Sequence, residues 1–257
     1  MTPMKMFDLA GRVALVTGAG SGIGRSAASL FAEHGAAVVL CGRRRAKLEE
    51  VQATLTGAGH RAAVVTMDVA DESDVRRAVA SASEAFGPID ILLNNAGVAS
   101  HTSVIDTTGD GWDAIVDTNL KGSWACAREV AARLIAARRP GSIVNVASIL
   151  GMMTQKGTGP YAASKAGLLH LTKVMAAEWA RYGIRVNGIA PGYFATDMAD
   201  DFLVSERGKK LIASVPQRRA GKVEELAGVL LLLASEASSY ITGTTIVVDG
   251  GLMLGQL

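Results

Sequence analysis

Tyr161 and Lys165 lie four positions apart in a segment with the pattern of a helix, downstream of Ser148, which follows an apolar run. Positions i and i+4 share one face of an α-helix, so the phenol and the ammonium are expected side by side. A free tyrosine titrates near pH ~10, and an adjacent cation favours the phenolate and lowers that pKa. Such a pair could move a proton at neutral pH. The spacing also arises by chance on exposed helices, so the surrounding elements decide between the two interpretations.

These elements alternate between short apolar runs and longer amphipathic segments. Continuous apolar runs predict buried strands, and their alternation with helices indicates a parallel sheet covered on both faces. Right-handed crossovers make such a sheet doubly wound. Strands are expected at residues 13–17, 37–41, 62–66, 89–94, 142–146, 185–190 and 245–249, and helices at residues 23–34, 47–55, 74–86, 112–138, 161–182 and 224–233. We therefore predict an α/β fold, a Rossmann-type doubly wound parallel sheet of about seven strands, in a single domain over residues 1–257.

A glycine-rich turn, TGAGSGIG at residues 17–24, directly follows the first expected strand. Glycines permit a tight turn and close approach to a ligand, and the helix start presents unpaired N–H groups to a pyrophosphate. The spacing GxGxxG does not fit, because Ile23 occupies the third glycine position, whereas TGxxxGxG does. A packing role for the glycines is the alternative, but the place after the first strand favours phosphate binding.

The second expected strand ends without the acidic residue that commonly binds the ribose hydroxyls of NAD. Arg43 and Arg44 follow it instead. A guanidinium matches the geometry of a 2′-phosphate, so these residues favour NADP(H), while NAD(H) and a solvated basic turn stay open. Asp68, after the third strand, could bind the adenine amino group or serve as a helix cap or turn residue.

Composition excludes several classes of function. The net charge of +2 comes without a basic stripe, which argues against nucleic acid as a partner. Cys41 and Cys126 are far apart and set in apolar runs, and the four histidines lack metal-ligand spacing, so we expect no metal site. Of these histidines only His101 follows a strand near the expected site, and a solvated loop position is favoured for it. The sequence has neither an apolar signal core nor a run of about eighteen apolar residues, so we expect a cytoplasmic protein without membrane contact.

Taken in order, these residues resemble the short-chain dehydrogenase/reductase family from about Leu9 onward. The matching motifs are TGxxxGxG at residues 17–24, Asp68, NNAG at residues 94–97, Asn119, Ser148, YxxxK at Tyr161 and Lys165, and Pro191 with Gly192 before Thr196. A chance match to all of them at the expected strand ends is negligible.

The resemblance implies four catalytic roles. Tyr161 would be the general acid or base at a carbonyl or alcohol oxygen. Ser148 would hydrogen-bond the same oxygen and stabilise its developing charge. Lys165 would lower the phenol pKa and hold the nicotinamide ribose, and Asn119 would fix a water that connects Lys165 to solvent. As alternatives, Asn119 could be a polar residue inside a helix and Ser148 a turn former.

The resemblance also assigns the cofactor contacts. Asn95 would contact the adenosine-side ribose through its backbone, and Gly97 would allow close approach. Phe194 stands where the family often has Val or Ile, which is harmless if only its backbone contacts the cofactor. The expected cofactor-binding residues are Gly18, Ser21, Gly22, Ile23, Gly24, Arg43, Arg44, Asp68, Val69, Asn95, Ala96, Gly97, Tyr161, Lys165, Pro191, Gly192, Phe194 and Thr196.

The substrate stays open at this stage. Walls are expected from residues 99–103, 149–157 and 193–202, where Met152, Met153, Tyr193, Phe194, Met198 and Phe202 give an apolar character. That character favours a ketone or secondary alcohol, with a 3-oxoacyl ester as one example. Gln155 and Lys156 could instead meet a hydroxylated or anionic substrate, and a sugar or polyol dehydrogenase is the alternative. A nucleotide-binding regulator that has lost catalysis is the alternative of another class, and the four filled catalytic positions argue against it.

Two further expectations concern mobility and assembly. Residues 192–219 are loop-like and mixed in composition, and such a segment could form a mobile flap over the site. The family usually forms tetramers or dimers through its long helices and last strand, here residues 112–138, 161–182 and 245–249. We therefore expect a homotetramer or homodimer.

Overall fold

A computed structural model describes residues 3–99, 101–196 and 203–255 of the 257-residue chain. Its centre is one seven-stranded sheet in the order β3-β2-β1-β4-β5-β6-β7, and every neighbouring pair is parallel. The strands are β1 (Val13–Thr17), β2 (Ala37–Gly42), β3 (Ala62–Thr66), β4 (Ile91–Asn94), β5 (Gly141–Val146), β6 (Ile184–Pro191) and β7 (Thr245–Val248). The predicted doubly wound fold is confirmed, and each expected strand lies within two residues of an observed one.

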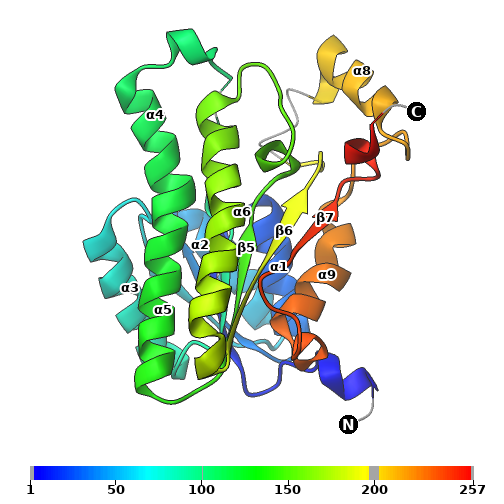
Figure 1. Ribbon diagram of the computed structural model, residues 1–257. Coiled ribbons are helices and arrows are strands. Elements are labelled where there is room, and N and C mark those ends of the chain that lie inside the picture. The colour runs from blue at the N-terminus through cyan, green and yellow to red at the C-terminus, as the bar shows by residue number, and fades with distance from the viewer. Residues whose placement is uncertain (1–2, 100, 197–202, 256–257) are drawn as a thin grey trace.

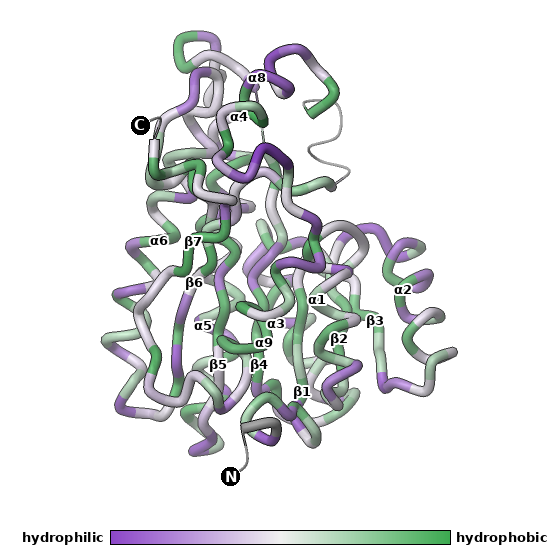
Figure 2. Tube along the Cα trace, turned by 90° about the vertical axis from the view of Figure 1, so that its right-hand side faces the viewer, coloured by the Kyte–Doolittle hydropathy of each residue, from purple (hydrophilic) through white to green (hydrophobic). Residues whose placement is uncertain are grey.

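Helices cover both faces of the sheet (Figure 1). One face packs against α1 (Gly22–Glu33), α2 (Arg45–Gly57) and α9 (Ala227–Ala234). The other packs against α3 (Glu72–Phe86), α5 (Gly122–Ala136) and α6 (Gly159–Trp179). Apolar segments of the tube lie in the central strands and hydrophilic segments on the outer helices (Figure 2). No helix in the described ranges is both long and apolar enough to cross a bilayer.

Strand β2 shows why the apolar runs are continuous rather than alternating. Val38 and Leu40 belong to the core beneath α1, while Val39 and Cys41 belong to the core beneath α3 and α5. Successive side chains of a strand point to opposite faces of the sheet. When helices cover both faces, every position of the strand is buried and favours an apolar residue. Burial raises the pKa of both core thiols, that of Cys126 to about 12, so they are inert hydrophobic groups at neutral pH.

The long helix expected over residues 112–138 is interrupted. Helix α4 (Gly109–Val116) passes into a π-helical turn over Asp117–Lys121 before α5 begins at Gly122. A Cβ at Gly122 would lie 2.7 Å from the Val69 carbonyl oxygen, so this helix lies directly against the chain that follows β3. The Ser123 hydroxyl donates to the Asn119 carbonyl oxygen at 2.9 Å, which satisfies a group within the widened turn. Such π-turns concentrate at functional sites.

The interpretation of residues 192–219 as loop-like was wrong for one stretch. Helix α8 (Glu206–Ser214) lies there, and the Ser205 hydroxyl caps it by accepting from the Gly208 N–H at 3.0 Å. This helix is short and largely polar, so its sequence lacks the extended pattern of apolar residues three and four positions apart that predicts a helix. Residues 197–202 lie outside the described residues, and the mobility of a flap stays a prediction.

Strands β1 and β4 are adjacent in the sheet although the chain leaves them toward opposite edges. In doubly wound sheets this switch point opens a crevice at the carboxyl ends of the strands. The carboxyl end of β6 points to the same end of the molecule, beneath α8 (Figure 1). The polar residues that follow β1, β4, β5 and β6 therefore converge at this end.

Candidate active site

The glycine turn after β1 is tied to the chain after β4. Gly18 and Gly22 have φ of 66° and 52°, a region that side chains with a Cβ avoid. The Asn95 amide nitrogen donates to the carbonyl oxygens of Thr17 and Gly18 at 3.0 and 3.3 Å. In return, the Thr17 hydroxyl accepts from the backbone N–H groups of Asn95 and Ala96, each at 2.9 Å. The side chain of Asn95 thus shapes the turn, a role that its expected backbone contact did not include.

The start of α1 suits a pyrophosphate. Ser21 is the N-cap residue, yet its side chain makes no capping hydrogen bond to the helix and instead accepts from Arg44 Nη2 at 3.2 Å. The first N–H groups of α1 therefore keep their capacity for an anion. Gly22 and Ile23 of this first turn line a groove. Gly24 does not line it and instead packs closely against the Gly18 carbonyl oxygen. The turn as a whole fits the diphosphate of a dinucleotide.

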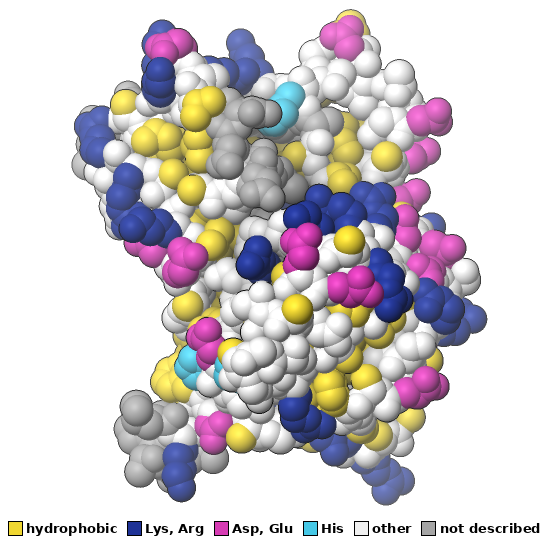
Figure 3. Space-filling view, turned by 180° about the vertical axis from the view of Figure 1, so that it is seen from behind, with side chains coloured by type: hydrophobic (Ala, Val, Ile, Leu, Met, Phe, Trp, Pro, Cys, Tyr) yellow, Lys and Arg dark blue, Asp and Glu magenta, His cyan; other side chains and the backbone are white. Residues whose placement is uncertain are grey.

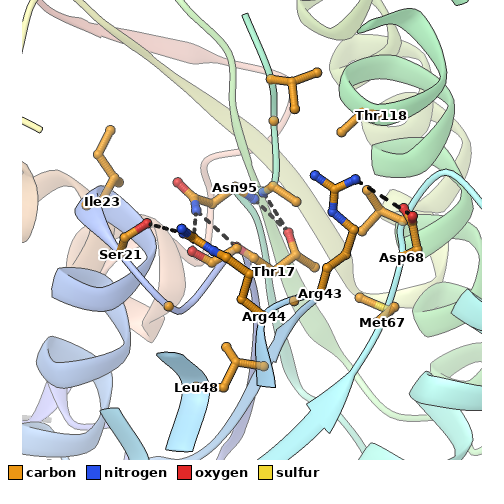
Figure 4. A pocket seen from close by; sticks show the side chains of 18 of the residues that line it. Thr17, Ser21, Ile23, Arg43, Arg44, Leu48, Met67, Asp68, Asn95 and Thr118 are labelled. Carbon is orange, nitrogen blue, oxygen red and sulfur yellow. Dashed lines mark hydrogen bonds and ion pairs between the residues drawn. The ribbon is translucent and has the colours of Figure 1, made fainter. Parts of the chain in front are cut away.

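A groove runs from the glycine turn across the ends of β2 and β3. Figure 4 shows Arg44 extended toward Ser21 and Arg43 toward Asp68, whose carboxylate lies 3.9 Å from Arg43 Nη1. Basic side chains gather beside the cleft on this side of the molecule (Figure 3). The groove is lined by twelve of the expected cofactor residues, Gly18, Ser21, Gly22, Ile23, Arg43, Arg44, Asp68, Val69, Asn95, Ala96, Gly97 and Thr196. Sequence reasoning missed Leu48, Met67, Val98 and Thr118, which also line it.

A second, adjoining pocket contains the proposed reacting groups. Ser148, Tyr161 and Lys165 all line it, and the Ser148 side chain hydrogen-bonds the Tyr161 phenol. Burial raises the pKa of Tyr161 above its usual value, and the bond with Ser148 opposes that shift. The expected lowering of this pKa by Lys165 is not observed, because burial dominates the shift and the one group that opposes it is Ser148. At neutral pH the phenol carries its proton.

Lys165 is oriented toward the sheet. Its ammonium donates to the Val146 carbonyl oxygen at 2.8 Å and lies 5.6 Å from the centre of the Tyr161 ring. The side chain is 4% exposed, and burial lowers the pKa of Lys165 to about 8. The predicted i and i+4 pairing is thus present on α6, with the lysine positioned by the end of β5 as well as by the tyrosine.

The lowered pKa of Lys165 makes stability depend on pH. Between pH 8 and the ordinary lysine value of 10.5, the folded protein binds fewer protons than the unfolded chain, so the free energy of unfolding contributed by this residue rises with pH. We expect Lys165→Met to be more stable than the wild type near neutral pH, by an advantage that shrinks by about 1.5 kcal/mol between pH 8 and 9.5. Urea unfolding of both proteins across this range measures the difference. A difference independent of pH would contradict the lowered pKa.

Asn119 occupies the centre of the π-helical turn and is fully buried. Its amide oxygen accepts from the Val98 N–H at 2.8 Å, and its amide nitrogen donates to the Val98 carbonyl oxygen at 2.9 Å. The same nitrogen donates to the Ser164 hydroxyl at 3.2 Å, which in turn donates to the Tyr161 carbonyl oxygen at 2.7 Å. The Asn119 side chain thus joins the β4 loop to α6. The predicted role of holding a water stays a prediction.

Behind the pocket, a chain of buried polar side chains crosses the sheet. The Asn94 amide nitrogen donates to the Asn145 side-chain oxygen and to the Ser123 carbonyl oxygen, each at 2.9 Å. The Asn145 amide nitrogen donates to the Thr172 hydroxyl at 2.9 Å. These bonds hold β4, β5, α5 and α6 together at the level of the site. Because buried polar groups are costly when left unpaired, the chain specifies one arrangement of these elements.

The end of β6 forms the third side of the pocket. Gly192 donates its N–H to the Val248 carbonyl oxygen at 2.8 Å, and a Cβ there would lie 2.8 Å from Asp249 Cα, so only glycine fits. Phe194 forms a parallel bridge with Gly221. The expected residues Pro191, Gly192, Phe194 and Thr196 all line the pocket.

The wall of the pocket is mainly apolar, as expected, and Ile149, Leu150 and Phe194 are among the residues that line it. Met152 and Met153 are not among the described residues that line it, and Met152 is 42% exposed to solvent. Met198 and Phe202 lie outside the described residues. Polar side chains also contribute to the wall, namely Gln155, Thr158, Tyr193 and His101. His101 is exposed, as expected for a loop residue, but it stands at this pocket.

Comparison with known proteins bears on this geometry. The family model described as enoyl-(acyl carrier protein) reductase matches residues 18–253. Gluconate 5-dehydrogenase from Gluconobacter oxydans is 39% identical over 98% of this chain and 98% of its own. The 3-oxoacyl-(acyl-carrier-protein) reductase FabG from Thermotoga maritima is 38% identical over 96% of this chain and 99% of its own.

A solved relative gives the same result in three dimensions. The gluconate 5-dehydrogenase from Burkholderia cenocepacia, crystallised with NADP and tartrate, is 38% identical and superposes with a TM-score of 0.93 over 98% of both chains. The glycine turn, the YxxxK pair beside Ser148 and these full-length matches agree with one another. The chain belongs to the short-chain dehydrogenase/reductase family of oxidoreductases.

Proposed function

We propose that the protein is an NADP(H)-dependent oxidoreductase that interconverts a ketone and a secondary alcohol, with Tyr161 as general acid or base. One observation carries this proposal: the protonated Tyr161 and its partner Ser148 lie in a pocket that adjoins the nucleotide groove. The two cavities share Ile23, Asn95, Gly97 and Thr196 in their walls. A nucleotide in the groove could therefore reach the reacting groups. The substrate class includes 3-oxoacyl esters.

The residues of the groove fit each part of the nucleotide. The start of α1 would hold the diphosphate, and Asp68 and Val69 would border the adenine. Asn95 and Gly97 would border the ribose, and the end of β6 would border the carboxamide. When bound, a nicotinamide cofactor supplies or accepts the hydride.

The side chains of this chain handle the proton and the developing charge. In the reductive direction, Tyr161 would donate its proton to the carbonyl oxygen, and Ser148 would donate a hydrogen bond to that oxygen. In the oxidative direction, the same phenol would accept the alcohol proton. Lys165 carries a charge below pH 8 and would favour the phenolate that remains after donation. Asn119 would act through the positions of Val98 and Ser164, which its amide group holds.

The preference for NADP(H) rests on Arg43 and Arg44. Both side chains border the groove, and one of them already contacts the Ser21 hydroxyl beside the glycine turn. A guanidinium there would bind a 2′-phosphate through charge-assisted hydrogen bonds. The Burkholderia cenocepacia relative has NADP bound, which supports this assignment.

Removing these arginines should discriminate between the two nucleotides. We expect Arg43→Ala and Arg44→Ala each to raise the Kd for NADPH about tenfold, because a charged hydrogen bond contributes about 1.5 kcal/mol. The Kd for NADH should change less than about twofold. Arg45→Ala is the matched control, since Arg45 pairs with Glu49 at 2.7 Å and does not line the groove. Isothermal titration measures all the values, and equal losses for both nucleotides would show that neither arginine binds the 2′-phosphate.

A sugar or polyol dehydrogenase is the second candidate. It is favoured by the polar side chains in the wall of the pocket, Gln155, Thr158 and Tyr193, since a hydroxylated substrate needs hydrogen-bonding partners. Two of the similar proteins are gluconate 5-dehydrogenases. The two candidates share one chemistry and differ only in what the wall recognises.

Incubation with NADPH or NADH and a panel of ketones tests the proposal directly. Oxidation of the nucleotide with formation of the corresponding alcohol is the expected result. Nucleotide binding without turnover of any ketone, and without oxidation of any alcohol in reverse, would instead support a silent regulator.

We also propose a cytoplasmic homotetramer or homodimer. Exposed apolar side chains support association, because Trp112, Val174 and Val247 are each 39–40% exposed on the elements expected at the contacts. Cys41 and Cys126 are both buried and unbridged, which suits a reducing compartment. Light scattering coupled to size-exclusion chromatography gives the number of subunits, and a monomeric mass would refute the assembly.

A further inference from the structure

We infer that Phe194 is a positioning residue for the nicotinamide end of the cofactor, and that it acts through the contact of its ring with Gly221. The inference deepens the proposed function and rests on it. Phe194 lies in the exit segment, residues 193–196, which follows β6 and borders the pocket that contains Tyr161. Its side chain is only 6% exposed and packs into the core beneath α1 and α9.

The exit segment borders both cavities. Thr196, its last residue, lines the nucleotide groove as well as the pocket that contains Tyr161. A Cβ added to Gly22 would lie 3.5 Å from Thr196 Cγ2, so the segment reaches the glycine turn at the start of α1. A nucleotide that extends from the groove into the pocket would therefore pass along this segment. The place of the segment then decides how the nicotinamide end meets the reacting groups.

Two main-chain hydrogen bonds tie the exit segment to the chain at Gly221. The Gly221 N–H donates to the Tyr193 carbonyl oxygen, and the Ala195 N–H donates to the Gly221 carbonyl oxygen, each at 2.9 Å. Together they make the parallel bridge that has Phe194 at its centre. The bridge lies outside the seven strands of the sheet. So short a ladder is marginally stable by itself, and side-chain packing has to support it.

The ring of Phe194 supplies this support, because it lies directly on Gly221. A Cβ added to Gly221 would lie 2.5 Å from Cε1 of the ring, 2.7 Å from Cδ1 and 2.9 Å from Cζ. Gly221 does not have a positive φ, so the ring, rather than the backbone conformation, excludes a side chain at this position. The ring and the glycine are therefore complementary in shape. In a close-packed interior, a change of volume at either residue must move the exit segment.

The contact lies at one end of the proposed nucleotide site only. Phe194 is not among the described residues that line the nucleotide groove. Arg43, Arg44 and Asp68 line that groove and do not line the pocket that contains Tyr161. A displaced exit segment should therefore weaken the binding of the nicotinamide end and leave the binding of the adenosine end unchanged. A purely structural role of the ring would not distinguish the two ends.

The test measures the Kd for NADPH and for 2′-phospho-ADP-ribose, which has every part of NADPH except the nicotinamide. We expect the wild type to bind NADPH about tenfold more tightly than this analogue. Phe194→Ala and Gly221→Ala should each remove most of that difference, while the Kd for the analogue stays within about twofold. The two losses should not multiply in the double variant, because the methyl added at position 221 enters the space that the ring leaves. Phe86→Ala is the matched control at the end of α3, outside both cavities, and should change neither Kd.

The outcomes separate this inference from the proposed function. Equal losses for NADPH and the analogue, or no loss for either, would overturn the inference, because the ring would then serve the fold alone. Losses that multiply in the double variant would show that Phe194 does not act through Gly221. Should Phe194→Ala fail to fold, Phe194→Leu gives the same comparison with a smaller loss, and melting temperatures show which variants are folded. A wild type that binds NADPH and reduces no ketone would overturn the proposed function, while the same affinities still decide the inference.

Discussion

The Tyr161→Phe variant is expected to lose about a thousandfold in kcat while it retains the wild-type affinity for nucleotide. The ring stays, so the packing of α6 is preserved, but the proton that burial holds on the phenol is gone. Ser148 also loses the partner that its side chain contacts. Steady-state kinetics with NADPH and a reducible ketone measure the loss, and nucleotide titration measures the retained Kd.

The matched control for this change is Tyr182→Phe, at a phenol that is 39% exposed and bonded to Arg181. It should leave kcat within about twofold, because Tyr182 contacts none of the proposed reacting groups. A Tyr161→Phe variant that kept a tenth or more of wild-type activity would remove Tyr161 from the mechanism. A variant that also lost nucleotide affinity would mean that the phenol matters mainly for binding.

The second large effect is expected from Gly24→Ala, which should abolish tight nucleotide binding. A Cβ at this position would lie 2.3 Å from the Gly18 carbonyl oxygen and 2.5 Å from Asn95 Nδ2. Both atoms belong to the hydrogen-bonded turn that forms the proposed phosphate site, so the added methyl must displace the turn itself. We expect the Kd for NADPH to rise at least a hundredfold and the free energy of unfolding to fall by about 1–3 kcal/mol.

Gly228→Ala provides the contrast. Gly228 lies in α9, and no described atom outside its own helix lies within 4 Å of the place that an added methyl would take. Alanine should therefore leave binding unchanged and stabilise the helix by up to about 1 kcal/mol. Differential scanning fluorimetry and nucleotide titration measure both variants. If Gly24→Ala bound NADPH as the wild type does, the close contact between the turn and α1 would not be needed for the site.

The sheet could be predicted because its signal is local. Seven apolar runs of strand length, covered on both faces, leave little choice of fold, and the residues that end β1, β4 and β5 are the ones that line the site. The proposed catalytic side chains could be selected for a similar reason. Tyr161 and Lys165 lie within one helix, so their relation depends on helical geometry alone.

Features that depend on contacts between distant segments could not be predicted. The π-helical turn at Asn119 adjoins the tight approach of Gly122 to Val69, and the bracing of the glycine turn by Asn95 depends on the pairing of β1 with β4. Met152 and Met153 were expected in the apolar wall, but Ile149, Leu150 and Gln155 line the pocket in that stretch. Composition gives the chemistry of a loop, and only packing decides which of its side chains face inward.

The π-helical turn has a consequence for how the length of this chain can vary. Each residue added to or removed from a helix rotates everything beyond it by about 100°. Ser123 lies four residues after Asn119, and its hydroxyl donates to the Asn119 carbonyl oxygen. The number of residues between the two therefore sets the rotation of α5 about its axis relative to the sheet. An insertion between the two would turn Asn119 away from Val98 or turn Ser123 away from Asn94. Between α4 and α5, a substitution changes the contacts of one side chain only. A change of even one residue in length would break the contacts that hold Asn119 and Ser123 in the site.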